Sequence, residues 1–176
     1  MRKALLALGM VLAGVAPGLA GFVAEVTLGP GFKPDAVSKV VVVSTECHEA
    51  LDCRRIEREV AAELTRAQPA IAVTVGDRVY SELLRTGHER YATDLREPIA
   101  RTFEADSLLE IAAPHASPGM ATRKRSEVKI TLRLVRPTGE ILFLGEGTGR
   151  PQNTLSSPEK AAGEVAERVF EKVFKR

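Results

Sequence analysis

The sequence contains no tryptophan, and aromatic residues make up only 5% of its 176 residues. The apolar content of 44% therefore has to build a core from Val, Leu, Ile and Ala. No G-x-G-x-x-G, P-loop or G-x-S-x-G motif is present, and the three histidines are scattered along the chain. These absences predict a protein that is not an enzyme and that needs no cofactor.

The chain also lacks an excess of charge of one sign. It has 25 basic and 23 acidic residues, and the difference of two equals the contribution of Arg2 and Lys3 at the N-terminus. A neutral surface gives no long-range attraction to nucleic acid or to an anionic membrane. We therefore expect no nucleic-acid partner, although the calculated pI is near 8.6.

The N-terminal residues have the pattern of an export signal. Arg2 and Lys3 precede an uncharged stretch at residues 4–24, and small residues lead up to Ala20. This order predicts a signal peptide, residues 1–20, that is cleaved after Ala20. The uncharged stretch is also long enough to span a membrane, so an uncleaved anchor through residues 4–24 is the alternative. We expect a periplasmic protein, with inner-membrane anchoring or secretion as alternatives, and membrane contact only if the segment is retained.

The rest of the sequence predicts one α+β domain. Residues 21–37 are rich in Gly and Pro and are expected to form an irregular leader, and residues 38–176 are expected to form the domain. Short, continuously apolar runs predict buried strands, and these lie at residues 39–44, 70–75 and 107–112.

Apolar residues spaced by four predict helices between these strands. The first helix runs to about Ala67, with Glu57 among its outward-facing residues. The second begins with Asp77 as its cap and ends at Gly87, and a further helical stripe covers residues 91–103.

The pattern changes to alternation near residue 128, which predicts a hairpin of two strands around Pro137-Thr138-Gly139. In the second of these strands, three alternating glycines at residues 145–149 predict a bulge or a close backbone approach at the sheet edge. Ser157 as N-cap and Pro158 at the first position then predict a last helix. The order βαβαβββα predicts a mixed five-stranded sheet with helices packed on it.

Cys47 and Cys53 are the two cysteines of the chain. In an oxidising compartment such a pair favours a disulfide. Residues six apart on one straight helix lie about 9 Å apart along its axis, so the bond requires a helix that begins near Asp52. Free thiols are one alternative. A metal site formed by Cys47, His48 and Cys53 is another, although this spacing is not that of an established zinc site.

A polar stretch at residues 114–126 contains the basic run Arg123, Lys124 and Arg125. Loops of this length are often functional, which makes the run a candidate for contact with an acidic partner, a glycan or lipid headgroups. A solvated loop tip is the alternative interpretation. An exposed sheet edge is the other surface that we expect a protein partner to use.

Four segments together suggest a family. A Pro-bearing leader enters a Val-rich strand at residues 32–44, and residues 103–109 form a small step into another strand. The hairpin at residues 132–143 contains a Thr-Gly-Glu turn, and an Ala- and Val-rich helix follows. These segments resemble the domain shared by the TolB amino-terminal domain, the CsgG-like curli secretion lipoproteins and the LpoB-like activators of penicillin-binding proteins.

The resemblance implies an anticodon-binding-domain-like α+β fold and a non-enzymatic role as an accessory or assembly protein of the bacterial cell envelope. Its partners would be envelope proteins, and the family supplies no catalytic residues. The chain departs from the family in having neither the lipid-attachment cysteine of its lipoprotein members nor the β-propeller of TolB. The alternative function is that of a small periplasmic protein that binds a ligand or a metal at the corner formed by Cys47, His48 and Cys53.

Overall fold

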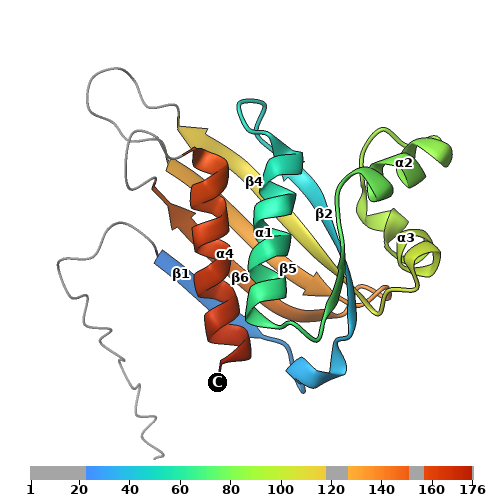
Figure 1. The fold of residues 1–176 in the computed structure, drawn as a ribbon, viewed down its shortest axis with the longest axis horizontal. Helices are drawn as coiled ribbons and strands as arrows, with labels where there is room; N and C mark the ends of the chain where they lie inside the picture. The colour runs from blue at the N-terminus through green and yellow to red at the C-terminus, as the bar shows by residue number, and fades with distance from the viewer. Residues whose placement is uncertain (1–22, 118–126, 151–156, 176) are drawn as a thin grey trace, which may run out of the picture.

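A six-stranded mixed sheet forms the centre of the fold in a computed structural model, which describes residues 23–117, 127–150 and 157–175 (Figure 1). The strand order across the sheet is β1-β6-β5-β4-β2-β3. β2 runs parallel to β3 and β4, whereas β1, β6, β5 and β4 pair in antiparallel fashion. The strands are β1 (Val23–Leu28), β2 (Lys39–Cys47), β3 (Ala72–Thr74), β4 (Ser107–Ser117), β5 (Glu127–Val135) and β6 (Ile141–Gly149).

Two helices lie on each face of this sheet. Side by side on one face are α1 (Cys53–Ala67) and α4 (Pro158–Phe174), as Figure 1 shows. The opposite face is covered near β2 and β4 by α2 (Asp77–Arg85) and α3 (Arg96–Phe103). Two short 3-10 helices, η1 (Pro34–Ala36) and η2 (Thr93–Leu95), complete the described elements. None of the helices in the described ranges is long and apolar enough to cross a membrane.

β2 is buried on both faces, as its continuous run of valines predicts. Val40 and Val42 pack in the core beneath α1 and α4, while Val41 and Val43 pack in a second core with α2 and α3. The α+β class, the mixed sheet and the order of the elements that follow β1 are therefore confirmed.

The position of β1 shows that two predictions are wrong, the irregular leader and the number of strands. Its residues lie in the stretch predicted to be an irregular leader, yet Val23–Leu28 pairs with β6 along its whole length. The sheet therefore has six strands and not five. Except for Gly21, the glycines and prolines that suggested a leader follow this strand, and none interrupts it. Its hydrogen-bond partner lies more than a hundred residues away, so no local pattern reveals the pairing.

Two helix starts also differ from the expectation. α2 has Gly76 as its N-cap, with φ 76°, and Asp77 is its first residue, so Asp77 is not the cap. The helical stripe at residues 91–103 divides into η2 and α3, with Pro98 in the first turn of α3. Proline is tolerated there because the first N–H groups of a helix have no intrahelical partner.

The alternating glycines of β6 allow α4 to approach the sheet closely. A Cβ atom on Gly147 would lie 2.4 Å from Val165 Cγ1 and 2.6 Å from the carbonyl oxygen of Val23. A Cβ atom on Gly145 would meet Val169 in the same way. The predicted close backbone approach is thus confirmed, but it lies beneath α4 and not at the sheet edge, because β1 covers that side of β6.

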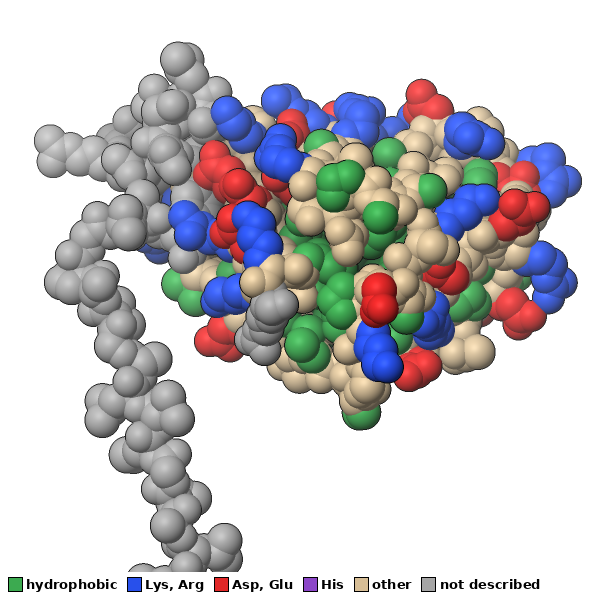
Figure 2. Space-filling view, turned by 60° about the horizontal axis from the view of Figure 1, so that its bottom comes forward, with side chains coloured by type: hydrophobic (Ala, Val, Ile, Leu, Met, Phe, Trp, Pro, Cys, Tyr) green, Lys and Arg blue, Asp and Glu red, His purple; other side chains and the backbone are tan. Residues whose placement is uncertain are grey.

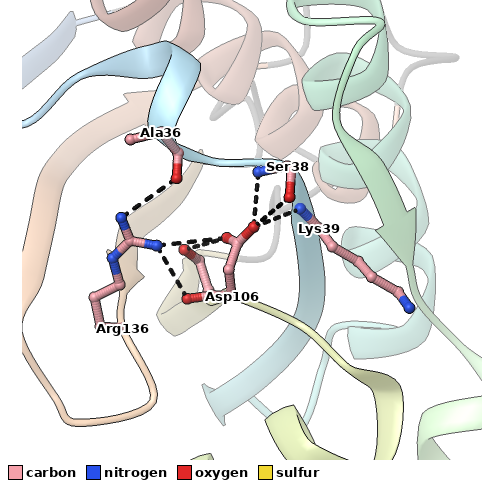
Figure 3. Close-up of polar contacts among 6 residues, drawn as sticks. Ala36, Ser38, Lys39, Asp106 and Arg136 are labelled. Atoms are coloured by element: carbon pink, nitrogen blue, oxygen red, sulfur yellow. Dashed lines mark hydrogen bonds and ion pairs between the residues drawn. The ribbon is translucent and has the colours of Figure 1, made fainter.

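Asp106 fastens the start of β2 to the start of β4 (Figure 3). Its Oδ2 accepts hydrogen bonds from the backbone N–H groups of Ser38 and Lys39, at 2.8 and 2.9 Å, and from the Ser38 hydroxyl at 2.7 Å. Arg136, at the end of β5, lies 3.7 Å from the other carboxylate oxygen and also donates to the carbonyl oxygen of Ala36. One carboxylate thereby holds three distant segments together.

The ionised form of Asp106 stabilises the fold. Burial alone would raise the pKa of this carboxyl, but the hydrogen bonds from Ser38 and its neighbours outweigh burial and lower the pKa below its ordinary value. A lowered pKa in the folded state means that the contribution to stability is present above the unfolded value of about 4. It is lost as the pH falls through the folded pKa.

Asp106→Asn is expected to lower the free energy of unfolding at pH 7 by about 1.5–3 kcal/mol, because hydrogen bonds to a charged group are lost. The difference from the parent protein should be smaller at pH 3 than at pH 7, because the contribution of the ionised form declines once the pH is below the unfolded pKa of about 4. Urea unfolding followed by circular dichroism measures both values. Asp35→Asn, at an exposed carboxylate on η1, is the matched control and should change stability little. An equal loss at both pH values would contradict the role of the charge.

The surface near the end of α4 is partly apolar. Figure 2 shows apolar side chains gathered near the middle of this side of the molecule, with charged side chains around them. Phe32 and Phe174 are its partly buried aromatic residues, and they pack on the buried Phe143 with ring centroids 6.1 and 6.5 Å away. This cluster closes the core where α4 ends.

Candidate functional site

A pocket of about 560 Å³ opens at the carboxyl end of β2. One wall is residues 44–49 of β2 and the loop that follows, and a second is the start of α1. The remaining wall consists of Tyr80 on α2 and residues 89–91. β2 and β3 are neighbouring parallel strands whose following helices, α1 and α2, lie on opposite faces of the sheet. Open α/β sheets bind ligands at this kind of crevice, so the pocket is the candidate site.

A disulfide between Cys47 and Cys53 forms part of the pocket wall, with the two Cα atoms 6.0 Å apart. α1 begins at Cys53, and the side chain of Asp52 caps it by accepting a hydrogen bond from the backbone N–H of Arg55 at 3.0 Å. The helix therefore begins where the geometric argument requires, with Cys47 at the end of the preceding strand.

Three hydrogen bonds of its backbone N–H groups hold the loop between the cysteines. The backbone N–H of His48 donates to the Ala113 carbonyl at 2.8 Å, and that of Ala50 donates to His48 Nδ1 at 3.2 Å. The N–H of Asp52 donates to Glu159 Oε1 on α4 at 3.3 Å. Both cysteine sulfurs are in the disulfide, and the described residues contain no cluster of three or more potential metal ligands. The corner is thus a rigid wall of the pocket, and its cysteine and histidine side chains do not form a metal site here.

Tyr80 connects the pocket to a buried carboxyl group. Its hydroxyl donates to Glu57 Oε1 at 2.9 Å, and Glu57 is only 1% exposed, so the prediction that it faces outward is wrong. Burial raises the pKa of Glu57, and hydrogen bonds from Ser44 and Tyr80 act in the opposite direction. On the other side of the ring, the guanidinium of Arg54 lies 4.3 Å from the ring centroid and pairs with Asp77 at 3.5 Å.

Tyr91 connects the pocket to a second buried carboxylate, Glu110 on β4, whose side chain is fully buried. The Tyr91 hydroxyl donates to Glu110 Oε1 at 2.8 Å. Arg96 binds both carboxylate oxygens, at 2.6 and 3.0 Å, and Arg133 on β5 lies 3.3 Å from Oε2. These contacts fix the segment that enters α3 against the sheet, and Tyr91 thereby forms a rigid wall of the pocket.

Sequence reasoning missed this polar layer because the periodic stripes assigned the tyrosines to the core. Two features of the sequence could have indicated these buried carboxyl groups. Glu110 is a lone acid inside the apolar run of β4, and an acid in such a position must be paired if the strand is buried. Glu57 follows Ile56 directly and lies three residues before Val60, which places it beside the buried stripe of α1.

The chemistry of the pocket favours binding over catalysis. Burial is the largest cause that raises the pKa of both Tyr80 and Tyr91, and their carboxylate partners raise it further. Both hydroxyls therefore stay protonated near neutral pH. Of the remaining histidines, neither His88 nor His115 lines the pocket. The predicted interaction run Arg123, Lys124 and Arg125 lies outside the described residues.

The disulfide is expected to contribute to the free energy of unfolding. Cys47→Ser together with Cys53→Ser is expected to lower the free energy of unfolding by about 2 kcal/mol, because the bond closes a short loop in the unfolded chain. In guanidinium without reductant, the exported parent protein should expose no thiol to Ellman's reagent. Adding a reductant should lower the stability of the parent protein to that of the double variant and leave the variant unchanged. Two reactive thiols in the untreated parent protein would contradict the bond.

No protein-family model matches the chain, and no curated protein matches it either. Solved structures do match. PelC from Paraburkholderia phytofirmans, crystallised as a dodecamer, superposes with a TM-score of 0.64 at 16% identity, over 89% of this chain and 99% of that chain. Lipoprotein GNA1162 from Neisseria meningitidis superposes with a TM-score of 0.52 at 18% identity, over 79% of this chain and 99% of that chain. The C-terminal domain of LpoB from Salmonella enterica gives a TM-score of 0.49 at 16% identity, over 65% of this chain and 83% of that chain.

At these identities the similarities establish a shared fold. The first two matches cover nearly the whole length of the matched chains, and one of those chains is a lipoprotein. The coarser part of the resemblance found in the sequence is thereby supported. Its finer part, which concerns the TolB and CsgG-like proteins, stays a prediction.

Proposed function

We propose that the protein is a non-enzymatic accessory protein of the bacterial cell envelope that is exported to the periplasm and acts through protein–protein contacts, with copies of itself among its partners. The observation that supports this most is the match to PelC, which covers 99% of that chain, because that protein is a dodecamer in its crystal. The basic and apolar N-terminal segment, with its pattern of an export signal, supports the location.

The basic run is a better candidate for this contact than the edge of β1. β1 is the last strand of the sheet on its side, and unpaired edge groups are a common route to strand addition. However, Lys172 on α4 donates a hydrogen bond to the carbonyl oxygen of Ala24 on β1. This bond occupies a backbone acceptor of β1, which opposes the pairing of a further strand there. We therefore assign the contact to the Arg123, Lys124 and Arg125 run.

A ring of more than two copies needs a contact between two different surfaces of the protein. The outward face of β1, β6 and β5 is a polar surface of mixed charge that can serve as the second partner, since it exposes Lys129 as well as two glutamates. It exposes Glu25 and Glu146, which lie directly opposite each other in the pairing of β1 with β6. Like charges in this position repel each other, and a basic partner would relieve the repulsion.

The test is the mass of the protein in solution. The full-length chain is expressed with its N-terminal segment, purified from the periplasmic fraction and measured by light scattering over a range of concentrations. We expect a mass that is a multiple of the monomer mass, which is at most 19.0 kDa. Replacing Arg123, Lys124 and Arg125 with Gln should shift the protein toward the monomer, because the cationic side of the contact is removed.

The control variant replaces three exposed basic residues elsewhere, Lys33, Arg78 and Lys160, with Gln and should keep the parent mass. A monomer at every concentration, together with no envelope protein recovered by cross-linking in cells, would contradict the proposed function. An oligomer that survives neutralisation of the basic run would remove that run from the proposal and leave the self-association standing.

A second candidate function, ligand binding at the corner formed by Cys47, His48 and Cys53, is favoured by a specific observation. That corner is one wall of the 560 Å³ pocket, and the pocket size is in the usual range for small-molecule sites. The proposals for ligand binding and for self-association rest on different residues, so the protein can have both functions.

A further inference from the structure

The hydrogen bonds of Tyr80 and Tyr91 within the protein determine what the two side chains can offer to a molecule in the pocket. A phenol has one proton to donate and lone pairs to accept with. The proton of Tyr80 is donated to Glu57 at 2.9 Å, and the proton of Tyr91 is donated to Glu110 at 2.8 Å. Both acceptors lie inside the protein, at 1% and 0% exposure. Neither hydroxyl therefore has a proton left to donate to a ligand, and the Tyr91 oxygen already accepts a hydrogen bond from Arg96 inside the protein, which leaves the Tyr80 oxygen as an acceptor.

The carboxylates of the pocket add further acceptors. Glu46, Glu49 and Glu89 line it, are exposed, and have no ion-pair partner among the residues that the structure describes. Asp52 also lines the pocket, but its carboxylate caps α1 and so offsets the positive end of that helix. The rim is thus negative, and its three free carboxylates need no rearrangement to meet a donor.

The positive groups of the pocket do not balance this charge. Arg54 is held on the ring of Tyr80 and against Asp77. Arg90 is the other arginine of the lining, so four carboxylates face two arginines. His48 accepts a hydrogen bond on Nδ1 from the N–H of Ala50, which fixes its ring in the loop. The lining therefore has an excess of negative charge and of acceptors.

We propose that this pocket binds a small organic cation through a primary ammonium or guanidinium group, with the free rim carboxylates and the Tyr80 oxygen as its acceptors. Such a group supplies only donors, and its charge makes each hydrogen bond to a carboxylate stronger than a neutral one. A bare metal ion fits less well, because the described residues form no cluster of three metal ligands and the volume of 560 Å³ suits a larger guest.

The walls of the pocket are also held in place by contacts within the protein, without a ligand. The disulfide fixes one wall, and the ion pairs of Glu110 with Arg96 and Arg133 fix the wall that contains Tyr91. Binding to a preformed site loses little free energy in ordering the protein. This inference rests on the second candidate function, ligand binding at the disulfide corner, and is independent of self-association.

The experiment uses a matched pair of probes on the full-length, isotope-labelled protein. Butylguanidinium carries the charge, and N-butylurea is its neutral isostere. Backbone amide shifts of residues 44–53 and 89–91 are followed by NMR as each probe is added. We expect a saturable shift with butylguanidinium and an affinity for N-butylurea that is weaker by about tenfold or more, because charge-assisted hydrogen bonds are lost.

A variant with Glu46→Gln, Glu49→Gln and Glu89→Gln should weaken butylguanidinium by about tenfold or more. These side chains are exposed, so the substitutions leave the fold intact. The control variant has the same change at three exposed glutamates elsewhere, Glu25→Gln, Glu97→Gln and Glu140→Gln, and should bind as the parent does.

The outcomes separate the inference from the function on which it rests. Equal affinity for the two probes, or pocket shifts with acetate and none with butylguanidinium, would overturn the cation site and leave ligand binding standing. An unchanged affinity in the pocket variant would also overturn the assigned acceptors. If butylguanidinium, N-butylurea and acetate all cause no shift of the pocket amides, both the cation site and the second candidate function are overturned.

Discussion

The carboxylate of Glu110 lies in the middle of the sheet without contact to solvent, and the fold around it is arranged to compensate for that burial. An isolated carboxylate in an apolar core costs far more free energy than a domain can supply, so it must be paired and hydrogen-bonded. Tyr91, Arg96 and Arg133 meet this requirement. Two of the three belong to the segment that enters α3, which is thereby held on the sheet. Because Tyr91 also lines the pocket, the same carboxylate determines the shape of the candidate site.

Local patterns in the sequence predicted most of the framework. The valine run of β2, the alternation in β5, the start of α4 at Ser157 and the start of α1 near Asp52 all depend on neighbouring residues, and the structure has each of them. β1 escaped prediction because its stability comes from pairing with β6, which lies far away in the sequence. The wall of the pocket formed by the two tyrosines was missed for the same reason, although the disulfide corner that forms another wall was a predicted ligand site. The tyrosines have the spacing of core residues, and only the contacts with Glu57 and Glu110 show that their hydroxyls matter.

The fold separates two surfaces with different chemistry. The disulfide corner and the tyrosines form a concave, acceptor-rich pocket at the carboxyl end of β2, enclosed by α1 and α2. The antiparallel half of the sheet instead presents an open polar face, on which Glu25 and Glu146 stand opposite each other. The proposed contacts with proteins and the proposed binding of a small cation therefore rest on different residues.

The central claim is that buried Glu110 holds the wall of the pocket in place, and hydrogen–deuterium exchange of Glu110→Gln tests it most directly. The account predicts faster exchange in residues 89–96 of the variant, because the charged pairs with Arg96 and Arg133 are lost, and unchanged exchange in α1 and α4. Glu97→Gln, at an exposed glutamate on α3, should leave the exchange of residues 89–96 as it is in the parent protein. Unchanged exchange of that segment in Glu110→Gln, or an equal increase throughout the protein, would contradict the account.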